Sequence, residues 1–256
     1  MSPDKKSKRQ ERREKMQQQE ARRRLTTIGI ITVVGAFLVF AIVWPQIRPI
    51  AEVVAIDTTP PATADGNTAG DPNAPIKIEE FADFQCPFCE RFHEQTQPLL
   101  MQHYVDTGKV HFVYRSMGNF VSQNIGGGRT ESQDAALAAY CAADQDKFWE
   151  MQNALFANVL GEDVGSFTDR RLQAIAEKAG LDMAAFNSCY NSGEFEDQVQ
   201  QDFADGSAAG ITGTPGFLIT YTANGETKTK TLSGAQPFST FQQELEAILL
   251  EIGVES

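Results

Sequence analysis

The pattern of apolar and polar positions divides the chain into an apolar segment, a polar connector and a folded domain. Residues 25–44 contain no charged side chain over twenty positions. At about 1.5 Å per residue, such a helix spans roughly 30 Å, the thickness of the hydrocarbon core of a bilayer. Residues 45–73 are rich in Pro, Thr, Ala, Asp and Gly, a composition typical of a flexible linker. We therefore expect a transmembrane helix at 25–44, a linker at 45–73 and a folded domain at 74–252.

Within the expected domain, the period of the apolar positions changes twice. Short apolar runs predict strands at 76–84, 110–114, 216–221 and 228–232. Apolar residues three and four apart predict helices at 90–106, kinked at Pro98, and at 237–252. The pattern from about 130 to 208 is helical and predicts four or five helices. The expected architecture is an α/β fold of order β-α-β, a helical insertion at about 130–208, and β-β-α.

Charge is distributed unevenly along the chain. Residues 1–24 hold ten Lys or Arg and four Asp or Glu, so this tail carries a net charge of +6. Since the whole chain has a net charge of −12, the rest of the chain carries −18. An acidic body argues against a nucleic-acid partner, because phosphate contacts need a basic surface. A basic flank before an apolar segment predicts a cytoplasmic N-terminus, a single pass through the cell membrane and an extracytoplasmic domain. A cleaved signal peptide is the alternative, but the apolar stretch is longer than such segments usually are.

All four cysteines, Cys86, Cys89, Cys141 and Cys189, follow the apolar segment. An even number of cysteines in an oxidising compartment fits two disulfides. For Cys141 and Cys189, a structural disulfide is the expectation, and a second redox pair or two buried thiols are the alternatives. Their loop of nearly fifty residues would give a disulfide an entropic contribution of roughly 4 kcal/mol.

The segment Cys86-Pro87-Phe88-Cys89 lies between an expected strand and an expected helix. Cys86 occupies the position of a helix N-cap, and Pro87 the first helical position, where a missing N–H costs nothing. Free N–H groups and the helix dipole then favour the Cys86 thiolate, which is the nucleophilic form. A C-x-x-C disulfide closes too short a loop to be an effective structural cross-link, so we interpret the pair as a redox dithiol. A metal site is the alternative, with two thiolates and His93 as copper ligands, but a closed zinc site needs four ligands.

One of the two glutamates at the end of the first strand should point into the domain, because side chains alternate along a strand. A buried carboxylate near Cys89 would have a raised pKa and could take its proton. The alternative is that both Glu79 and Glu80 are solvated at a sheet edge.

Four motifs together resemble the DsbA-like family of thiol:disulfide oxidoreductases, which combine a thioredoxin-like fold with a helical insertion. The motifs, in an order and spacing typical of that family, are Phe-Ala-Asp-Phe-Gln-Cys-Pro-Phe-Cys at 81–89, Ala-Tyr-Cys-Ala at 139–142, Phe-Trp at 148–149 and Gly-Thr-Pro at 213–215. The resemblance covers roughly residues 74–252.

The resemblance implies roles for individual residues. Cys86, Cys89 and Pro87 match the catalytic motif, and Glu80 matches the acidic position of the family. Phe88 stands where the best-known strong oxidants carry His, so we expect a less extreme oxidant. Thr214 and Pro215 match the substrate-binding loop, in which the proline is cis; an ordinary turn proline is the alternative. Some family members are also similar in having a second disulfide, here Cys141–Cys189, in the insertion.

The resemblance also implies an activity and partners. The expected function is disulfide formation in unfolded exported proteins, without a cofactor or metal. Reoxidation would fall to a quinone-linked membrane protein of the DsbB or vitamin-K-epoxide-reductase type. A reductase or isomerase is the alternative within the same chemistry, and a metal- or copper-binding module is the alternative from another class.

Overall fold

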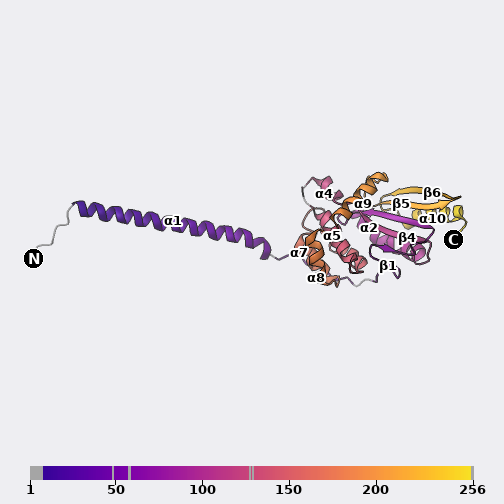
Figure 1. The fold of residues 1–256 in the computed structure, drawn as a ribbon, viewed down its shortest axis with the longest axis horizontal. Coiled ribbons are helices and arrows are strands. Elements are labelled where there is room, and N and C mark those ends of the chain that lie inside the picture. Colours follow the sequence, from indigo (N-terminus) through magenta and orange to yellow (C-terminus); the bar gives the residue numbers. More distant parts are fainter. Residues whose placement is uncertain (1–7, 48, 57–58, 127, 129, 255–256) are drawn as a thin grey trace, which may run out of the picture. The chain divides into compact units, whose positions relative to one another are not determined.

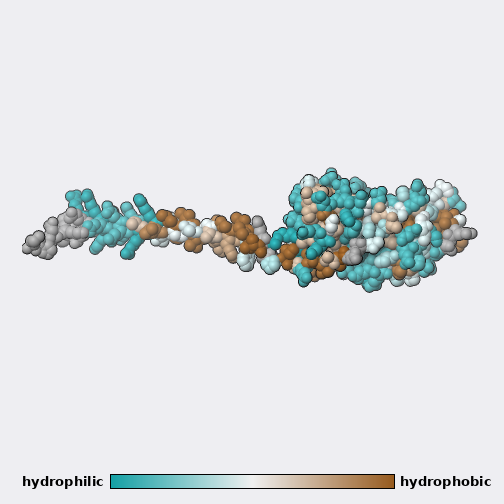
Figure 2. All heavy atoms as spheres, turned by 90° about the horizontal axis from the view of Figure 1, so that it is seen from below, coloured by the Kyte–Doolittle hydropathy of each residue, from teal (hydrophilic) through white to brown (hydrophobic). Residues whose placement is uncertain are grey.

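The computed structural model describes residues 8–47, 49–56, 59–126, 128 and 130–254, and the chain forms two compact units (Figure 1). The first, Met1–Ile50, contains helix α1 (Lys8–Ile47), and the second, Ala51–Ser256, contains the sheet. By length and composition, α1 is apolar enough to cross a membrane in the part that ends at Trp44. Figure 2 shows this division, with a hydrophilic first part of α1 followed by a hydrophobic part.

The helix is longer than the segment predicted at 25–44. It extends toward the N-terminus because Arg, Lys, Gln, Glu and Ala, which fill the basic tail, are strong helix formers. Within it, the hydroxyls of Thr26, Thr27 and Thr32 donate to carbonyls four residues earlier, so these polar groups are satisfied inside the helix.

The second unit is built on one mixed sheet of six strands. Along the sheet the order is β1 (Ala64–Asp65), β2 (Thr68–Ala69), β4 (Val110–Ser116), β3 (Ile76–Ala82), β5 (Gly216–Ala223) and β6 (Glu226–Ser233). The central pair β3 and β4 is parallel, and every other pair is antiparallel. The predicted order of β-α-β, insertion and β-β-α is confirmed.

One face of the sheet is covered by helices that flank the insertion in sequence. They are α2 (Pro87–Gln95), α3 (Gln97–Leu100), the π-helical turn η1 (Met101–Val105) and α10 (Phe238–Ile252). Phe92 of α2 packs against Phe217 of β5 and Phe241 of α10, with ring centroids 4.6 and 5.6 Å away. The helix predicted at 90–106 is interrupted at Thr96, two residues before Pro98, which cannot donate a helical hydrogen bond.

The insertion is helical, as predicted, and it begins earlier than residue 130. Its helices are α4 (Phe120–Ile125), α5 (Glu131–Ala143), α6 (Phe148–Ala157), α7 (Asp169–Lys178), α8 (Met183–Ser192) and α9 (Glu196–Ala208). Most of α5 is buried, so it forms the centre of this block. Helix α9 packs on the face of β3 that carries Phe81, and a Cβ at Gly206 would lie 2.7 Å from the Phe81 ring.

Part of the segment expected as a linker is instead integral to the second unit. Strand β2 pairs with β4, which places residues 64–69 in the sheet. Further upstream, the buried Arg171 donates to the Ala51 carbonyl at 2.7 Å, and the Asn158 amide pairs with the backbone N–H and C=O of Val54. These contacts are backbone hydrogen bonds, which leave no trace in an apolar pattern.

Candidate active site

Strand β3 and helix α2 position the dithiol. The chain leaves β3 at Ala82, and Cys86 forms the N-cap of α2 with extended backbone angles (φ −75°, ψ 118°) and Pro87 at the first helical position. The Cys86 side chain is nearly buried at 6% exposure and Cys89 is fully buried. Both are free thiols in this structure. Of the two cysteines, Cys86 is therefore the one that can be reached from solvent.

The surroundings of Cys86 favour its thiolate. Its pKa falls to about 6, chiefly because the Cys89 thiol donates a hydrogen bond to the sulfur. Burial of Cys86 raises this pKa, while hydrogen bonds from the Thr214 hydroxyl and from the backbone N–H groups of Cys89 and Phe88 lower it further. The pKa of Cys89 rises well above its ordinary value because of burial. At neutral pH the Cys86 sulfur is thus mainly a thiolate, while Cys89 holds its proton.

The Thr214-Pro215 loop lies against this sulfur, and its peptide bond is cis. The Cys86 sulfur is 3.3 Å from the Thr214 carbonyl oxygen. The Thr214 hydroxyl has no hydrogen-bond partner in the described part of the thiol form, so it is available to donate to the thiolate. Gly216 follows, and a Cβ there would lie 2.4 Å from the Ile211 side chain, so this close approach requires glycine.

The two glutamates of β3 face opposite ways. Glu79 pairs with Arg115 at 3.0 Å and with Lys77 at 3.1 Å. Glu80 is buried beneath the dithiol, and its Oε2 has no hydrogen-bond partner among the described residues. Burial raises the pKa of Glu80 to about 8, and its charge is one of the causes that raise the pKa of Cys89. Glu80 is therefore a buried titratable group whose ionisation affects the Cys89 thiol.

Asp83 is a second buried carboxylate, and it organises the loop before Cys86. Its two oxygens accept hydrogen bonds from the backbone N–H groups of Gln85 (2.8 Å) and Val121 (2.9 Å). Its carbonyl accepts from the Cys86 N–H at 3.0 Å. Burial raises the pKa of Asp83 to about 7, although these hydrogen bonds act to lower it. Asp83 thus connects the dithiol loop to α4.

The side chain of Gln85 holds the same loop against the insertion. Its amide nitrogen donates to Ser122 (3.0 Å), Ser132 (2.9 Å) and Asp163 (3.1 Å), and its amide oxygen accepts from the Asp163 N–H at 2.6 Å. These partners lie 37 to 78 residues away in sequence. Sequence reasoning missed this network, because no local pattern pairs such distant polar residues.

Phe88 is 53% exposed, and the Arg91 guanidinium lies 5.1 Å from its ring centroid. With Cys86 and Thr214, Phe88 lines a hollow of about 350 Å³ whose far wall is α4. Phe88 has no side-chain hydrogen to donate to the sulfur, so only its backbone N–H contributes to thiolate stabilisation.

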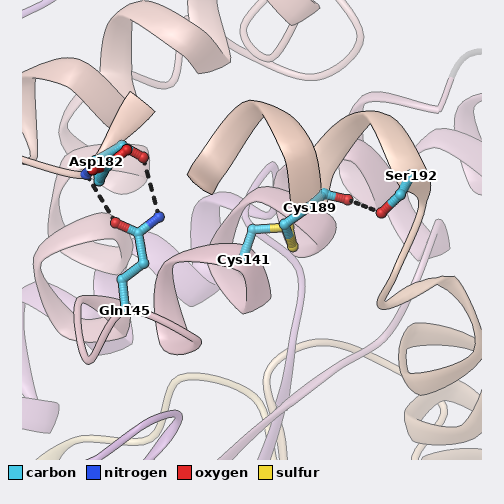
Figure 3. Close-up of a disulfide and its surroundings, with 5 residues drawn as sticks. All are labelled: Cys141, Gln145, Asp182, Cys189 and Ser192. Carbon is cyan, nitrogen blue, oxygen red and sulfur yellow. Dashed lines mark hydrogen bonds between the residues drawn. A yellow bond between two sulfur atoms is a disulfide. The ribbon is translucent and has the colours of Figure 1, made fainter. Parts of the chain in front are cut away.

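The remaining two cysteines are joined in the insertion, away from the dithiol. Cys141 of α5 and Cys189 of α8 form a disulfide with an S–S distance of 1.98 Å and a Cα–Cα distance of 5.8 Å (Figure 3). Beside it, Gln145 exchanges hydrogen bonds with the backbone of Asp182 at the start of α8 (Figure 3). The disulfide and these hydrogen bonds hold α8 to α5.

Within the part of the chain that the structure describes, no three metal-binding side chains come together. The His93 Nδ1 is 2.7 Å from the Gln97 amide oxygen, and its ring stacks on Phe156. The pKa of His93 is lowered by burial, so the ring is neutral at neutral pH. The structure thus brings the residues of the C-x-x-C motif, Glu80 and the Thr214-Pro215 loop together and places His93 in a separate environment.

The family model described as thioredoxin matches residues 62–235. Among relatives, a probable disulfide bond formation protein D of Bacillus anthracis is 26% identical over 152 residues, which cover 59% of this chain and 67% of that protein. The Na⁺/H⁺ antiporter NhaA 3 of Salinispora tropica is 30% identical over 165 residues, or 64% of this chain. The chain spans only 23% of the length of that antiporter.

Solved structures share the fold at lower identity. The oxidised BdbD of Bacillus subtilis superposes with a TM-score of 0.59 and 20% identity, covering 78% of this chain and all of that one. The α-DsbA1 of Wolbachia pipientis gives a TM-score of 0.59 at 22% identity, with 79% and 94% coverage. These similarities confirm the predicted fold.

Proposed function

Because the chain belongs to the thioredoxin family, we propose that it is a membrane-anchored thiol:disulfide oxidoreductase that forms disulfides in unfolded exported proteins. The observation that carries this proposal is the asymmetry of the dithiol. Cys86 has a pKa of about 6 at a partly open surface, while the Cys89 thiol is buried with a raised pKa. The Cys86 sulfur is thus suited to exchange with the thiol of a substrate, and the buried Cys89 sulfur is suited to form the disulfide with Cys86.

The reaction begins with the Cys86–Cys89 disulfide. A substrate thiolate attacks the Cys86 sulfur, a mixed disulfide forms, and Cys89 leaves as a thiolate that takes a proton from Glu80. Glu80 can supply this proton because its pKa of about 8 keeps it protonated at neutral pH. A second substrate thiolate then attacks the bonded substrate sulfur and releases the Cys86 thiolate. The substrate loses two electrons, which the Cys86–Cys89 pair retains as two reduced sulfurs.

The stabilised Cys86 thiolate supports the oxidising direction. The better the reduced form is stabilised, the more readily the disulfide is given away. A pKa of about 6 lies between those of thioredoxin, about 7, and DsbA, about 3.5. We therefore infer an oxidant of intermediate strength, which agrees with Phe88 in place of a hydrogen-bonding side chain.

Turnover requires that the dithiol be reoxidised. We propose a quinone-linked membrane protein as the electron acceptor, with α1 holding the domain at the same membrane. The basic residues before the apolar part of α1 support a cytoplasmic N-terminus and an extracytoplasmic dithiol. Protease accessibility in sealed and in opened cells tests this orientation: the domain should be cleaved in intact spheroplasts.

The reduction potential of the full chain in glutathione buffers tests the direction of electron flow. A value between about −120 and −180 mV would place the protein with the oxidases and isomerases. A value near about −270 mV would instead place it with thioredoxin, as a reductase. Replacing Cys89 with Ser provides a second test, because a redox enzyme then traps substrates as mixed disulfides on Cys86.

A further inference from the structure

Two hollows lie on either side of Pro87, and Glu162 borders both of them. The first, of about 350 Å³, contains the Cys86 sulfur and Thr214. The second, of about 290 Å³, is lined by Glu90 of α2 and by the loop around Leu160. A peptide whose cysteine reacts with Cys86 would therefore place its neighbouring residues beside these carboxylates.

The loop that carries Glu162 is held rigidly against the dithiol loop. Its next residue, Asp163, donates its N–H to the Gln85 amide oxygen at 2.6 Å. The Asp163 carboxylate accepts hydrogen bonds from the Gln85 amide at 3.1 Å and from the Ser122 hydroxyl at 2.5 Å. Because Gln85 is adjacent to Cys86, the two hydrogen bonds between Gln85 and Asp163 keep the backbone of the Glu162 loop close to the reacting sulfur.

Among the described residues, the two glutamates at this surface have no ion-pair partner. In the described part of the chain no cation pairs with Glu162 or with Glu90, and no Lys or Arg lines either hollow. Arg91 stands at the edge of this surface, with its guanidinium 5.1 Å from the Phe88 ring centroid, but it donates to the Ala235 carbonyl at 3.4 Å and pairs with neither glutamate. Partial burial, and then the charge of Glu94, raise the pKa of Glu90, so a cation placed here would relieve an unfavourable interaction.

The same surface has apolar and polar features that suit an unfolded chain. Phe88 and Ile125 line the first hollow and Leu160 lines the second, and all three are strongly exposed. Thr214, which is only 8% exposed, lines the first hollow beside Cys86. An exposed apolar surface next to the reacting sulfur suits a bound peptide.

We propose that Glu162 and Glu90 select substrate segments that carry Lys or Arg within one or two residues of the reacting cysteine. This inference rests on the proposed function and specifies its substrate class. The cation takes no part in the electron transfer, in which the substrate thiolate attacks Cys86 and Cys89 leaves. It contributes by Coulomb attraction at a partly solvated surface, which corresponds to roughly a threefold to tenfold rate preference.

The test compares two dithiol peptides of equal length that differ only in having Lys or Gln on both sides of the first cysteine. The oxidised full chain, in a non-ionic detergent, is mixed with each peptide, and peptide disulfide is measured after acid quenching. The ratio of the two kcat/KM values is determined for the wild type, for E90Q/E162Q and for E226Q. Glu226 is an exposed glutamate at the start of β6 that lines neither hollow, so E226Q is the matched control.

We expect the ratio in the wild type and in E226Q to exceed the ratio in E90Q/E162Q by roughly threefold to tenfold, and we expect this excess to shrink in high salt. Comparing this ratio between variants cancels the higher intrinsic reactivity of a cysteine beside Lys, because that effect is the same for every variant. E162K should favour a third peptide with Glu at the same positions. A wild-type ratio near one, or a ratio that E90Q/E162Q leaves unchanged, would overturn the inference while leaving the proposed function intact. If no peptide is oxidised at all, the proposed function fails, and the inference fails with it.

Discussion

Replacing Glu80 with Gln should stabilise the protein, and the gain should grow with pH. In the folded protein the pKa of Glu80 is about 8, against 4.5 as the ordinary value. Between these two values the folded state keeps a proton that the unfolded state has released, so wild-type stability falls as pH rises through this window. Because a glutamine at this position does not titrate, the stability of the variant does not fall with pH for this reason.

The magnitude follows from the width of the window. Each pH unit corresponds to about 1.4 kcal/mol, so the full difference of about 3.5 units amounts to about 5 kcal/mol above pH 8. At pH 7 the expected gain is about 3 kcal/mol, and below pH 4.5 it is close to zero. Relaxation around a charged Glu80 would reduce these values without changing their sign.

The assay is urea unfolding of the second unit, residues 51–256, at a series of pH values. Trp149 is the one tryptophan in this fragment, and because it is buried, its fluorescence reports unfolding directly. Glu79→Gln is the matched control, since Glu79 lies on the opposite face and pairs with Arg115. It should lower stability or leave it unchanged. A difference between wild type and Glu80→Gln that does not vary with pH would refute a buried, protonated Glu80.

Three further predictions follow from the same geometry. Replacing Cys89 with Ala should raise the pKa of the Cys86 thiolate above about 6, because it removes the strongest hydrogen-bond donor; ultraviolet thiolate absorbance against pH measures this. Replacing both cysteines of the α5–α8 disulfide with Ser should cost about 4 kcal/mol in urea unfolding and leave the potential of the dithiol unchanged, because a loop of 48 residues is released. Gly216→Ala should destabilise the fold by about 1–3 kcal/mol, because the new Cβ meets Ile211 at 2.4 Å; adding Ile211→Ala should recover part of this loss, and equal stability of Gly216→Ala and wild type would contradict the close approach.

The N-terminal boundary of the folded unit differs from the one predicted from the sequence. The Pro-rich segment before residue 74 has the composition of a linker, yet residues 64–69 form two strands and residues 51–54 are bound by Arg171 and Asn158. These contacts use backbone N–H and C=O groups, which nearly every residue carries. Composition therefore could not predict these contacts, because they depend on the position of the partner strand β4 and of the side chains of Arg171 and Asn158.

The order of strands and helices, the apolar helix and the position of Cys86 at a helix N-terminus could all be predicted from the amino-acid sequence. Each of these depends on local features: the period of apolar side chains, a run without charge, and a proline after the N-cap. The same local logic required Glu79 and Glu80 to face opposite ways.

The surroundings of the dithiol depend on how remote segments pack. The family resemblance implied roles for Glu80 and Thr214, and the packing buries Glu80 where its charge acts on Cys89, brings Thr214 to the Cys86 sulfur across 128 residues, and ties the loop of Glu162 to Gln85. The physical reason is that pKa values and charge selectivity depend on burial and on distances of a few ångströms. Those distances are set by how remote segments pack together, which no local pattern encodes.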